Sequence, residues 1–275
     1  MADVLENLSI PQTANYIREG EGTPVILIHG LAASLHDWDD SISPLVQNGY
    51  AAYAVDLLGH GDSPRLESRL YRMEWIFEHF FEWMKSLRLR EPAILIGHSL
   101  GGHVAMEYAR RVSAWTRGLI LVAPFYSRLQ LPFLLRKTYA RRNLSEWIVG
   151  RTPDWLFRRF VELSSGAIGH GLGALRSLPE KARLQTVLDY KRTAAGIYHV
   201  PNLIPDMSAH LHEIDIPTLV IWGDQDRTLM PSSFPRLVAG LPKGRGEMLH
   251  AGHVLHQSHA GDFNRIVTKF LEEIP

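Results

Sequence analysis

Short apolar runs rich in β-branched residues recur along this chain, and each is followed by a turn and a helix-like stretch. A strand buried on both faces reads as a continuous apolar run, and parallel strands need helical crossovers between them. The alternation therefore predicts an α/β fold with a mostly parallel central sheet flanked by helices. The runs span residues 25–28, 51–55, 93–96, 119–122 and 218–222, with an antiparallel strand expected near 13–18 and a last short strand at 246–249.

Helical spacing of large apolar residues covers 70–87, 100–111 and 263–271. The alternation breaks after Pro124, because residues 126–210 show no buried-strand run and contain short amphipathic stretches separated by Pro and Gly. We therefore expect a helical cap at 126–210, inserted into a core domain formed by residues 1–125 and 211–275.

Charge is unevenly distributed along the chain. The whole protein is formally neutral, which argues against a general nucleic-acid binder. Residues 127–200 nevertheless hold thirteen basic and five acidic residues, a formal charge of +8. We interpret this excess as a solvated outer face of the cap, with an anionic substrate or contact to an anionic membrane surface as the weaker alternatives.

The strongest signal for chemistry is a G-x-S-x-G motif at residues 97–101, between an apolar run and a stretch of good helix formers. This is the context of a nucleophile elbow, in which a tight strand-to-helix turn projects the serine from the sheet. Gly97 and Gly101 leave room where a Cβ would collide with the backbone. Ser99 is therefore the candidate nucleophile.

A serine hydroxyl is a weak nucleophile near neutral pH, so it needs a base that is oriented by a third group. Downstream of such an elbow, the acid comes first along the chain and the histidine second. Asp224 and Asp226 both follow the apolar run 218–222, and His253 follows the last predicted strand. Spacing alone does not decide which aspartate faces His253.

Several motifs in order make the chain similar to the α/β-hydrolase superfamily, over residues 29–253. Besides the elbow, they are HG at 29–30, D-x-x-G-x-G-x-S at 56–63 and G-x-x-D at 223–226. The resemblance implies a triad of Ser99, His253 and Asp226 rather than Asp224. It also implies an oxyanion hole formed by the backbone N–H groups of Leu31 and Leu100, and it implies no metal or organic cofactor.

The acyl pocket is expected to be lined by aromatic residues of the cap and of the loop after Leu31, although each of them is equally compatible with a plain core position. The candidates are Trp38, Phe125, Tyr126, Phe133, Trp147, Trp155 and Tyr198.

Histidines recur every three residues at 250, 253, 256 and 259. A metal site is the less favoured interpretation, because the series straddles a loop and a helix start and no H-E-x-x-H motif occurs. His256 and His259 are instead interpreted as a solvated helix face, and His98 as a structural neighbour of the nucleophile.

Together these features predict a serine hydrolase that cleaves a small or medium hydrophobic carboxylic ester through an acyl-enzyme. A carbon–carbon bond hydrolase, a thioesterase or a lysophospholipase would use the same triad. A ligand receptor on this fold and a non-catalytic scaffold are the non-enzyme alternatives. The N-terminal segment lacks the apolar core of a secretory signal, so a cytoplasmic location is expected, and the sequence leaves the oligomeric state open.

Overall fold

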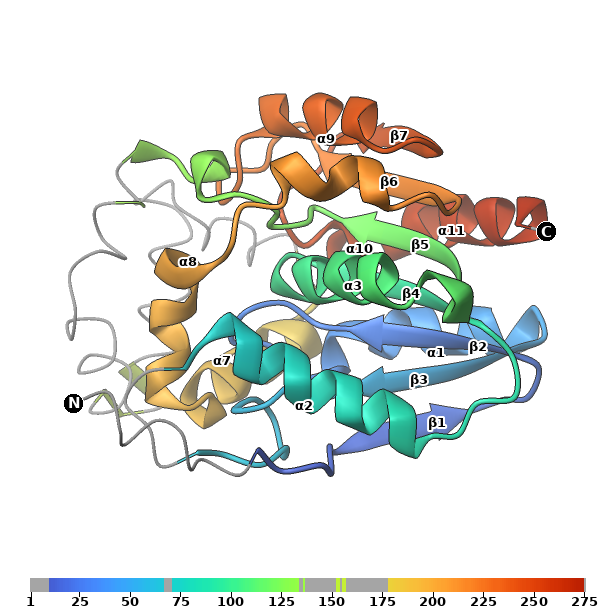
Figure 1. The fold of residues 1–275 in the computed structure, drawn as a ribbon. Helices are drawn as coiled ribbons and strands as arrows, with labels where there is room; N and C mark the ends of the chain where they lie inside the picture. Colours follow the sequence, from blue (N-terminus) through green and yellow to red (C-terminus); the bar gives the residue numbers. More distant parts are fainter. Residues whose placement is uncertain are drawn as a thin grey trace, which may run out of the picture.

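Among the described residues, seven strands form one sheet in the order β1-β3-β2-β4-β5-β6-β7 (Figure 1). The structure is a computed structural model that describes residues 10–66, 71–133, 136, 152–153, 155–156 and 178–274. Only β1 and β3 pair antiparallel, and every other neighbouring pair is parallel. The predicted fold class is confirmed. The strands are β1 (Tyr16–Glu19), β2 (Thr23–Ile28), β3 (Tyr50–Val55), β4 (Ala93–His98), β5 (Thr116–Val122), β6 (Thr218–Gly223) and β7 (Gly244–Leu249).

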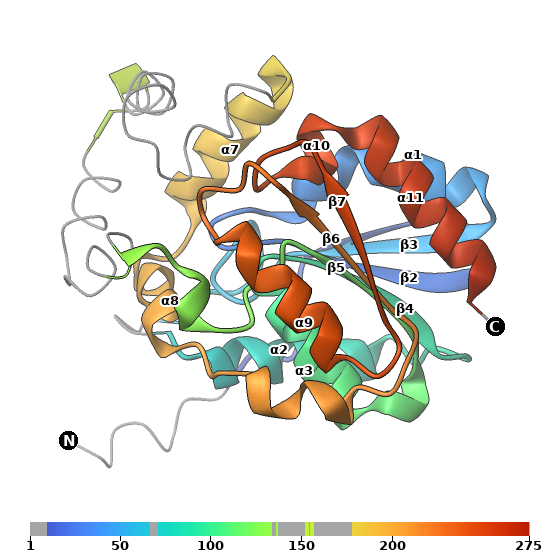
Figure 2. The same ribbon diagram turned by 90° about the horizontal axis from the view of Figure 1, so that it is seen from above.

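Helices cover both faces of this sheet. The described α-helices are α1 (Asp39–Gln47), α2 (Met73–Ser86), α3 (Leu100–Arg111), α7 (Glu180–Arg192), α8 (Val200–Leu203), α9 (Phe234–Gly240), α10 (Leu255–Ser258) and α11 (Ala260–Glu273). Short 3-10 turns lie at Leu35–Trp38, Ser113–Trp115, Arg128–Gln130, Ala195–His199, Ser208–Glu213 and Pro231–Ser233. Seen from above, α1, α10 and α11 lie on one side of the sheet and α2, α3 and α9 on the other (Figure 2).

The core follows from the alternation of side chains along each strand. Ile26 and Ile28 of β2 pack toward the cluster that contains α2, α3 and α9 residues. Val25 and Leu27 pack toward the cluster that contains α1 and α11 residues. All four are completely buried, which explains why a central strand reads as a continuous apolar run.

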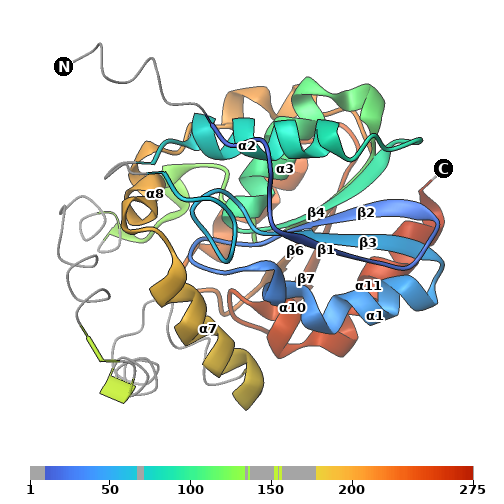
Figure 3. The same ribbon diagram turned by 90° about the horizontal axis from the view of Figure 1, so that it is seen from below.

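The segment predicted as a cap, 126–210, is described only in part. Its described portion includes α7 and α8, which lie beyond the carboxyl ends of the strands (Figures 1 and 3). The boundaries of the cap therefore stay a prediction. No described helix is long and apolar enough to cross a membrane.

Helix α7 is attached to the loops around it by polar contacts. Lys181 Nζ of the helix lies 3.0 Å from Asp39 Oδ2, and two residues after the helix the N–H of Ala194 donates to the carbonyl of Gly59 at 2.8 Å. Asp189 is buried on this helix and accepts a hydrogen bond from Gln185 Nε2 at 2.8 Å. Burial raises the pKa of the Asp189 carboxyl from 3.8 to about 6, against the hydrogen bonds from Gln185 and Ser34 that lower it.

This raised pKa predicts that Asp189→Asn stabilises the protein, but only at neutral and alkaline pH. Below pH 3.8 the carboxyl is protonated in both the folded and the unfolded chain, so burial costs nothing extra. As the pH rises through about 6, the folded chain must ionise a buried carboxyl and loses stability. The variant should gain up to about 3 kcal/mol in the free energy of unfolding at pH 8 and far less near pH 4.

Urea denaturation at both pH values measures this difference. Asp215→Asn is a suitable control, because the Asp215 side chain is 68% exposed. An Asp189→Asn gain that is equal at the two pH values would contradict the assignment.

Candidate active site

The candidate site lies where the strand order reverses. The chain passes from β2 to β3 on one side and later enters β4 on the other side of β2. Open α/β sheets bind ligands outside the carboxyl ends of the strands at such a point. The HG loop follows β2 directly, and Ser99 follows β4 directly.

Ser99 has the strained backbone expected of a nucleophile elbow. Its φ is +50° and its ψ is −110°, a region that non-glycine residues rarely occupy. The turn is held on both sides, because the Ser99 N–H donates to the carbonyl of Val122 at 2.9 Å and the Ser99 carbonyl accepts from Phe125 N–H at 2.9 Å. These two hydrogen bonds therefore maintain a backbone conformation that is unfavourable for a serine.

The two glycines of the motif are required by close backbone contacts. A Cβ on Gly97 would lie 2.4 Å from the carbonyl oxygen of Gly101. A Cβ on Gly101 would lie 2.2 Å from the carbonyl oxygen of Ile28, on the neighbouring strand. Helix α3 can thus start immediately after the serine and close to β2.

Each of the two candidate aspartates has a histidine partner. Asp226 Oδ2 lies 2.7 Å from His253 Nδ1, and its side chain has no exposed surface. Asp226 Oδ1 also accepts hydrogen bonds from the backbone N–H groups of Thr228 and Leu229, which fix the carboxylate. Asp224 Oδ2 lies 2.9 Å from His250 Nδ1 at the surface, where the His250 side chain is 79% exposed. The geometry therefore favours Asp226 as the partner of His253.

The loop that carries His253 lies against the elbow. The His253 and His98 rings are 4.9 Å apart, and His98 Nε2 lies 3.3 Å from the His253 carbonyl oxygen. Because His98 directly precedes Ser99, this contact brings the histidine loop beside the serine. Asp226, His253 and Ser99 follow β6, β7 and β4, respectively, at the same edge of the sheet.

The two candidate oxyanion donors lie on the loop after β2 and at the start of α3. Leu100 is the first residue of α3, and the first N–H groups of a helix have no partner inside the helix. Leu31 follows Gly30 in the loop after β2. A Cβ on Gly30 would lie 2.8 Å from His98 Nδ1, so this loop runs close to the elbow.

The aromatic residues expected in the pocket occupy different environments. Phe125, Tyr126 and Tyr198 are buried and retain between 5% and 8% exposure, and the Tyr198 hydroxyl donates to the carbonyl of Tyr190 at 2.7 Å. Phe133 and Trp155 are 62% and 69% exposed, and Trp147 lies outside the described residues.

The placement of Trp38 in the pocket needs correction. Its side chain is completely buried in the cluster that contains α1 and α11 residues, and its ring centroid lies 4.7 Å from that of His256. With no exposed surface, Trp38 is a core residue.

The interpretation of His256 as part of a solvated face is wrong. Its side chain has no exposed surface, because α10 packs it against Trp38 and His98. His250 and His253 pair with different aspartates, so the four histidines do not converge on one metal. His256 instead belongs to a buried group with His98 and Asp37, in which the potential ligand atoms lie within 4.8 Å of one another.

Asp37 is not among the predicted site residues, because no sequence motif marks it. Burial alone would raise the pKa of the Asp37 carboxyl, but its electrostatic interaction with His256 and its hydrogen-bonding contacts with His256 and His98 hold the pKa well below its usual range. Burial and the charge of His256 lower the pKa of His98 to about 4. A carboxylate therefore lies buried beside His98, the residue that precedes Ser99.

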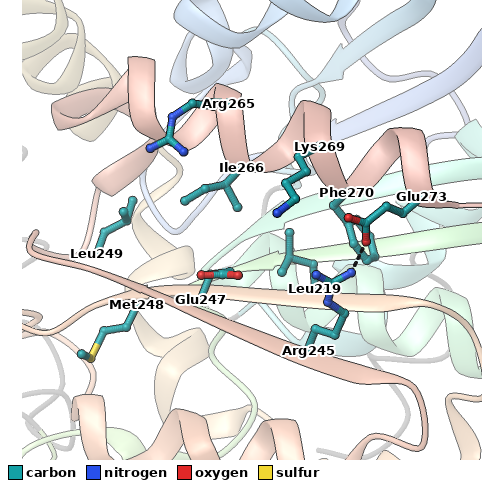
Figure 4. A pocket seen from close by; sticks show the side chains of 10 residues that line it. All are labelled: Leu219, Arg245, Glu247, Met248, Leu249, Arg265, Ile266, Lys269, Phe270 and Glu273. Atoms are coloured by element: carbon teal, nitrogen blue, oxygen red, sulfur yellow. Dashed lines mark hydrogen bonds and ion pairs between the residues drawn. The ribbon is translucent and has the colours of Figure 1, made fainter.

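A separate groove of about 300 Å³ lies between β7 and α11 (Figure 4). Charged side chains line much of it, and Arg245 and Glu273 form an ion pair there. None of Ser99, Asp226 and His253 is among its lining residues. Small-molecule sites are mostly apolar with a few placed polar groups, so this groove does not resemble a pocket for a hydrophobic acyl group.

Comparison with known proteins identifies the family of the chain. The family described as "Alpha/beta hydrolase family" matches residues 25–266. The chain is 26% identical over 270 residues to a putative non-heme chloroperoxidase of Synechocystis sp., with 92% of each chain covered. It is also 26% identical over 258 residues to the pimeloyl-[acyl-carrier protein] methyl ester esterase of Aeromonas hydrophila, covering 92% of this chain and 97% of that protein.

A solved structure of an esterase from Exiguobacterium antarcticum has the same fold, with a TM-score of 0.78 at 17% identity over 94% of this chain and 95% of that chain. The family match covers most of the sheet and both loops that carry the elbow and His253. The chain therefore belongs to the alpha/beta hydrolase family, and it is a hydrolase.

Proposed function

We propose that the protein is a carboxylic ester hydrolase in which Ser99 is the nucleophile, His253 the general base and Asp226 the residue that orients the histidine. The observation that carries the proposal is the strained backbone of Ser99 at the start of α3. Strain of this kind costs on the order of 1–3 kcal/mol, and it clusters at functional sites. The buried Asp226–His253 pair supplies the base that such a serine requires.

The proposed reaction follows from the contacts of His253. With Nδ1–H donating to Asp226 Oδ2, the lone pair of Nε2 is free to accept a proton. Ser99 Oγ attacks the ester carbonyl while His253 takes the hydroxyl proton, and the N–H groups of Leu31 and Leu100 stabilise the oxyanion. Collapse of the intermediate transfers the proton to the alcohol, which leaves. Water then hydrolyses the acyl-enzyme in the same way.

The substrate we propose is a small or medium hydrophobic ester. Two of the proteins compared above are named as esterases, one of them as a methyl ester esterase. The buried aromatic residues Phe125, Tyr126 and Tyr198 belong to the loop after β5 and to the described part of the predicted cap, beyond the carboxyl ends of the strands. We propose that these apolar side chains contact the acyl chain of the substrate, whereas the charged groove between β7 and α11 does not suit one.

A substrate panel tests the proposal. It contains p-nitrophenyl esters of increasing chain length, a thioester and a substrate for carbon–carbon bond hydrolysis. We expect the highest kcat/KM for one of the esters and a burst of p-nitrophenol equal to the number of active sites. A higher kcat/KM for the thioester or the carbon–carbon substrate would contradict the ester assignment while leaving the triad intact.

A further inference from the structure

Asp37 connects three segments that the proposed mechanism uses. Its Oδ2 lies 3.1 Å from His98 Nδ1 and 3.4 Å from His256 Nε2, and it accepts the N–H of Gly30 at 3.5 Å. Its Oδ1 accepts a hydrogen bond from Gln257 Nε2. The Asp37 side chain is only 6% exposed, so these contacts are made away from water.

Each partner of Asp37 lies one to four residues from a proposed reacting group. His98 directly precedes Ser99, and Gly30 directly precedes Leu31. His256 and Gln257 belong to α10, which begins two residues after His253. A displacement of the Asp37 carboxylate would therefore shift the nucleophile, the oxyanion donor and the general base together.

The charge of Asp37 gives these contacts their strength. Hydrogen bonds to an ionised group are roughly twice as strong as those between neutral groups. A buried carboxylate is also costly to leave without donors, so the surrounding loops are held to the positions that satisfy it. An amide of the same shape would present an N–H group to at least one partner and could not accept from all of them.

We propose that Asp37 is a positioning residue that holds the elbow, the oxyanion loop and the His253 loop in their active arrangement. Asp37 touches no reacting atom and acts through His98, His256 and Gly30. The inference rests on the proposed function, because it needs Ser99 and His253 to be the reacting groups.

The test compares Asp37→Asn with Asp39→Asn in the full chain. Asp39 lies two residues away at the protein surface, where it pairs with Lys181 and His36. Active sites are counted by the end point of fluorophosphonate labelling at Ser99 after the reaction has gone to completion, and kcat is expressed per active site. We expect Asp37→Asn to lower this kcat roughly 10- to 100-fold with KM changed less than about threefold, because a displacement of about 1 Å costs this much. Labelling of Ser99 by a fluorophosphonate should slow in proportion, and Asp39→Asn should match the wild type.

Counting active sites separates positioning from stability. A purely structural role would reduce the yield and the melting temperature but leave kcat per active site unchanged, and that result would overturn the proposal. His256→Gln, which keeps a polar group on α10, gives a second measurement with the same expected direction. If neither variant folds, Asp37 is required for folding and the proposal is wrong.

If the proposed triad itself is wrong, the experiments give a different result from the one that contradicts the role of Asp37. If Ser99→Ala still hydrolyses the ester, or if the wild type is not labelled at Ser99, the triad assignment fails before Asp37 is tested. If Ser99 is labelled and required, and the Asp37→Asn kcat per site equals that of the wild type, only the inference about Asp37 fails.

Discussion

Ser99→Ala should lower kcat for the best ester substrate by about 10⁴-fold or more, because the variant has no group to form the acyl-enzyme. The fold should be retained, since the change removes a single oxygen from a side chain and leaves the backbone contacts of the turn to Val122 and Phe125 in place. Circular dichroism and the melting temperature check the fold, and initial rates on purified protein check the activity. Ser113→Ala, at an exposed position in a 3-10 turn, serves as the matched control.

The Ser99 variant also identifies the labelled residue. A fluorophosphonate should modify the wild type at the peptide that contains Ser99 and should leave Ser99→Ala unmodified. Wild-type turnover by Ser99→Ala would rule out the nucleophile assignment. Labelling at another serine would do the same.

Asp226→Asn should lower kcat by about 10⁴-fold, whereas Asp224→Asn should change it less than about threefold. The side-chain amide that Asp226→Asn introduces would donate to His253 or leave its Nδ1 with the wrong tautomer, so Nε2 would no longer accept the serine proton. Asp224 instead pairs with the exposed His250, and pairs at the surface contribute little.

The two aspartate variants form a matched pair, because both substitutions lie in the same loop and remove the same charge. Their kcat values on one ester, measured with protein of confirmed melting temperature, decide between them. A larger loss for Asp224→Asn would reverse the assignment of the acid.

The sequence predicts the sheet well because buried parallel strands leave little choice of residue type. All five central runs lie within observed strands, and α3 has the predicted bounds, 100–111. Helix α1 was not predicted, because it contains Pro44 and begins with polar residues, and its apolar side is limited to Ile42, Leu45 and Val46. Its formation depends on packing against α11 and the sheet, which local sequence does not reveal.

The site is predictable where a local motif encodes it and not where distant residues meet. The elbow requires glycines at fixed spacing, so the pattern around Ser99 is visible in the sequence. Asp37 lies 61 residues from His98 and follows no motif, so only the folded chain shows their contact. His256 looks like a surface residue because the three residues after it, 257–259, are polar, yet Trp38 and His98 enclose it from distant parts of the chain.

The adjacency of β5 and β6 has a consequence for how such a protein can change over evolution. The chain leaves the sheet at Val122 and returns at Thr218 beside the same strand. Closing a loop costs entropy only as the logarithm of its length, so doubling this excursion would cost about 0.6 kcal/mol. Lengthening the segment between these strands therefore costs little chain entropy, whereas its residues Ile197, Val200 and Leu211 belong to the core cluster that contains α2 and α3 residues and must be kept. Insertions that leave these core residues in place can change the cap without disturbing the residues that follow β4, β6 and β7.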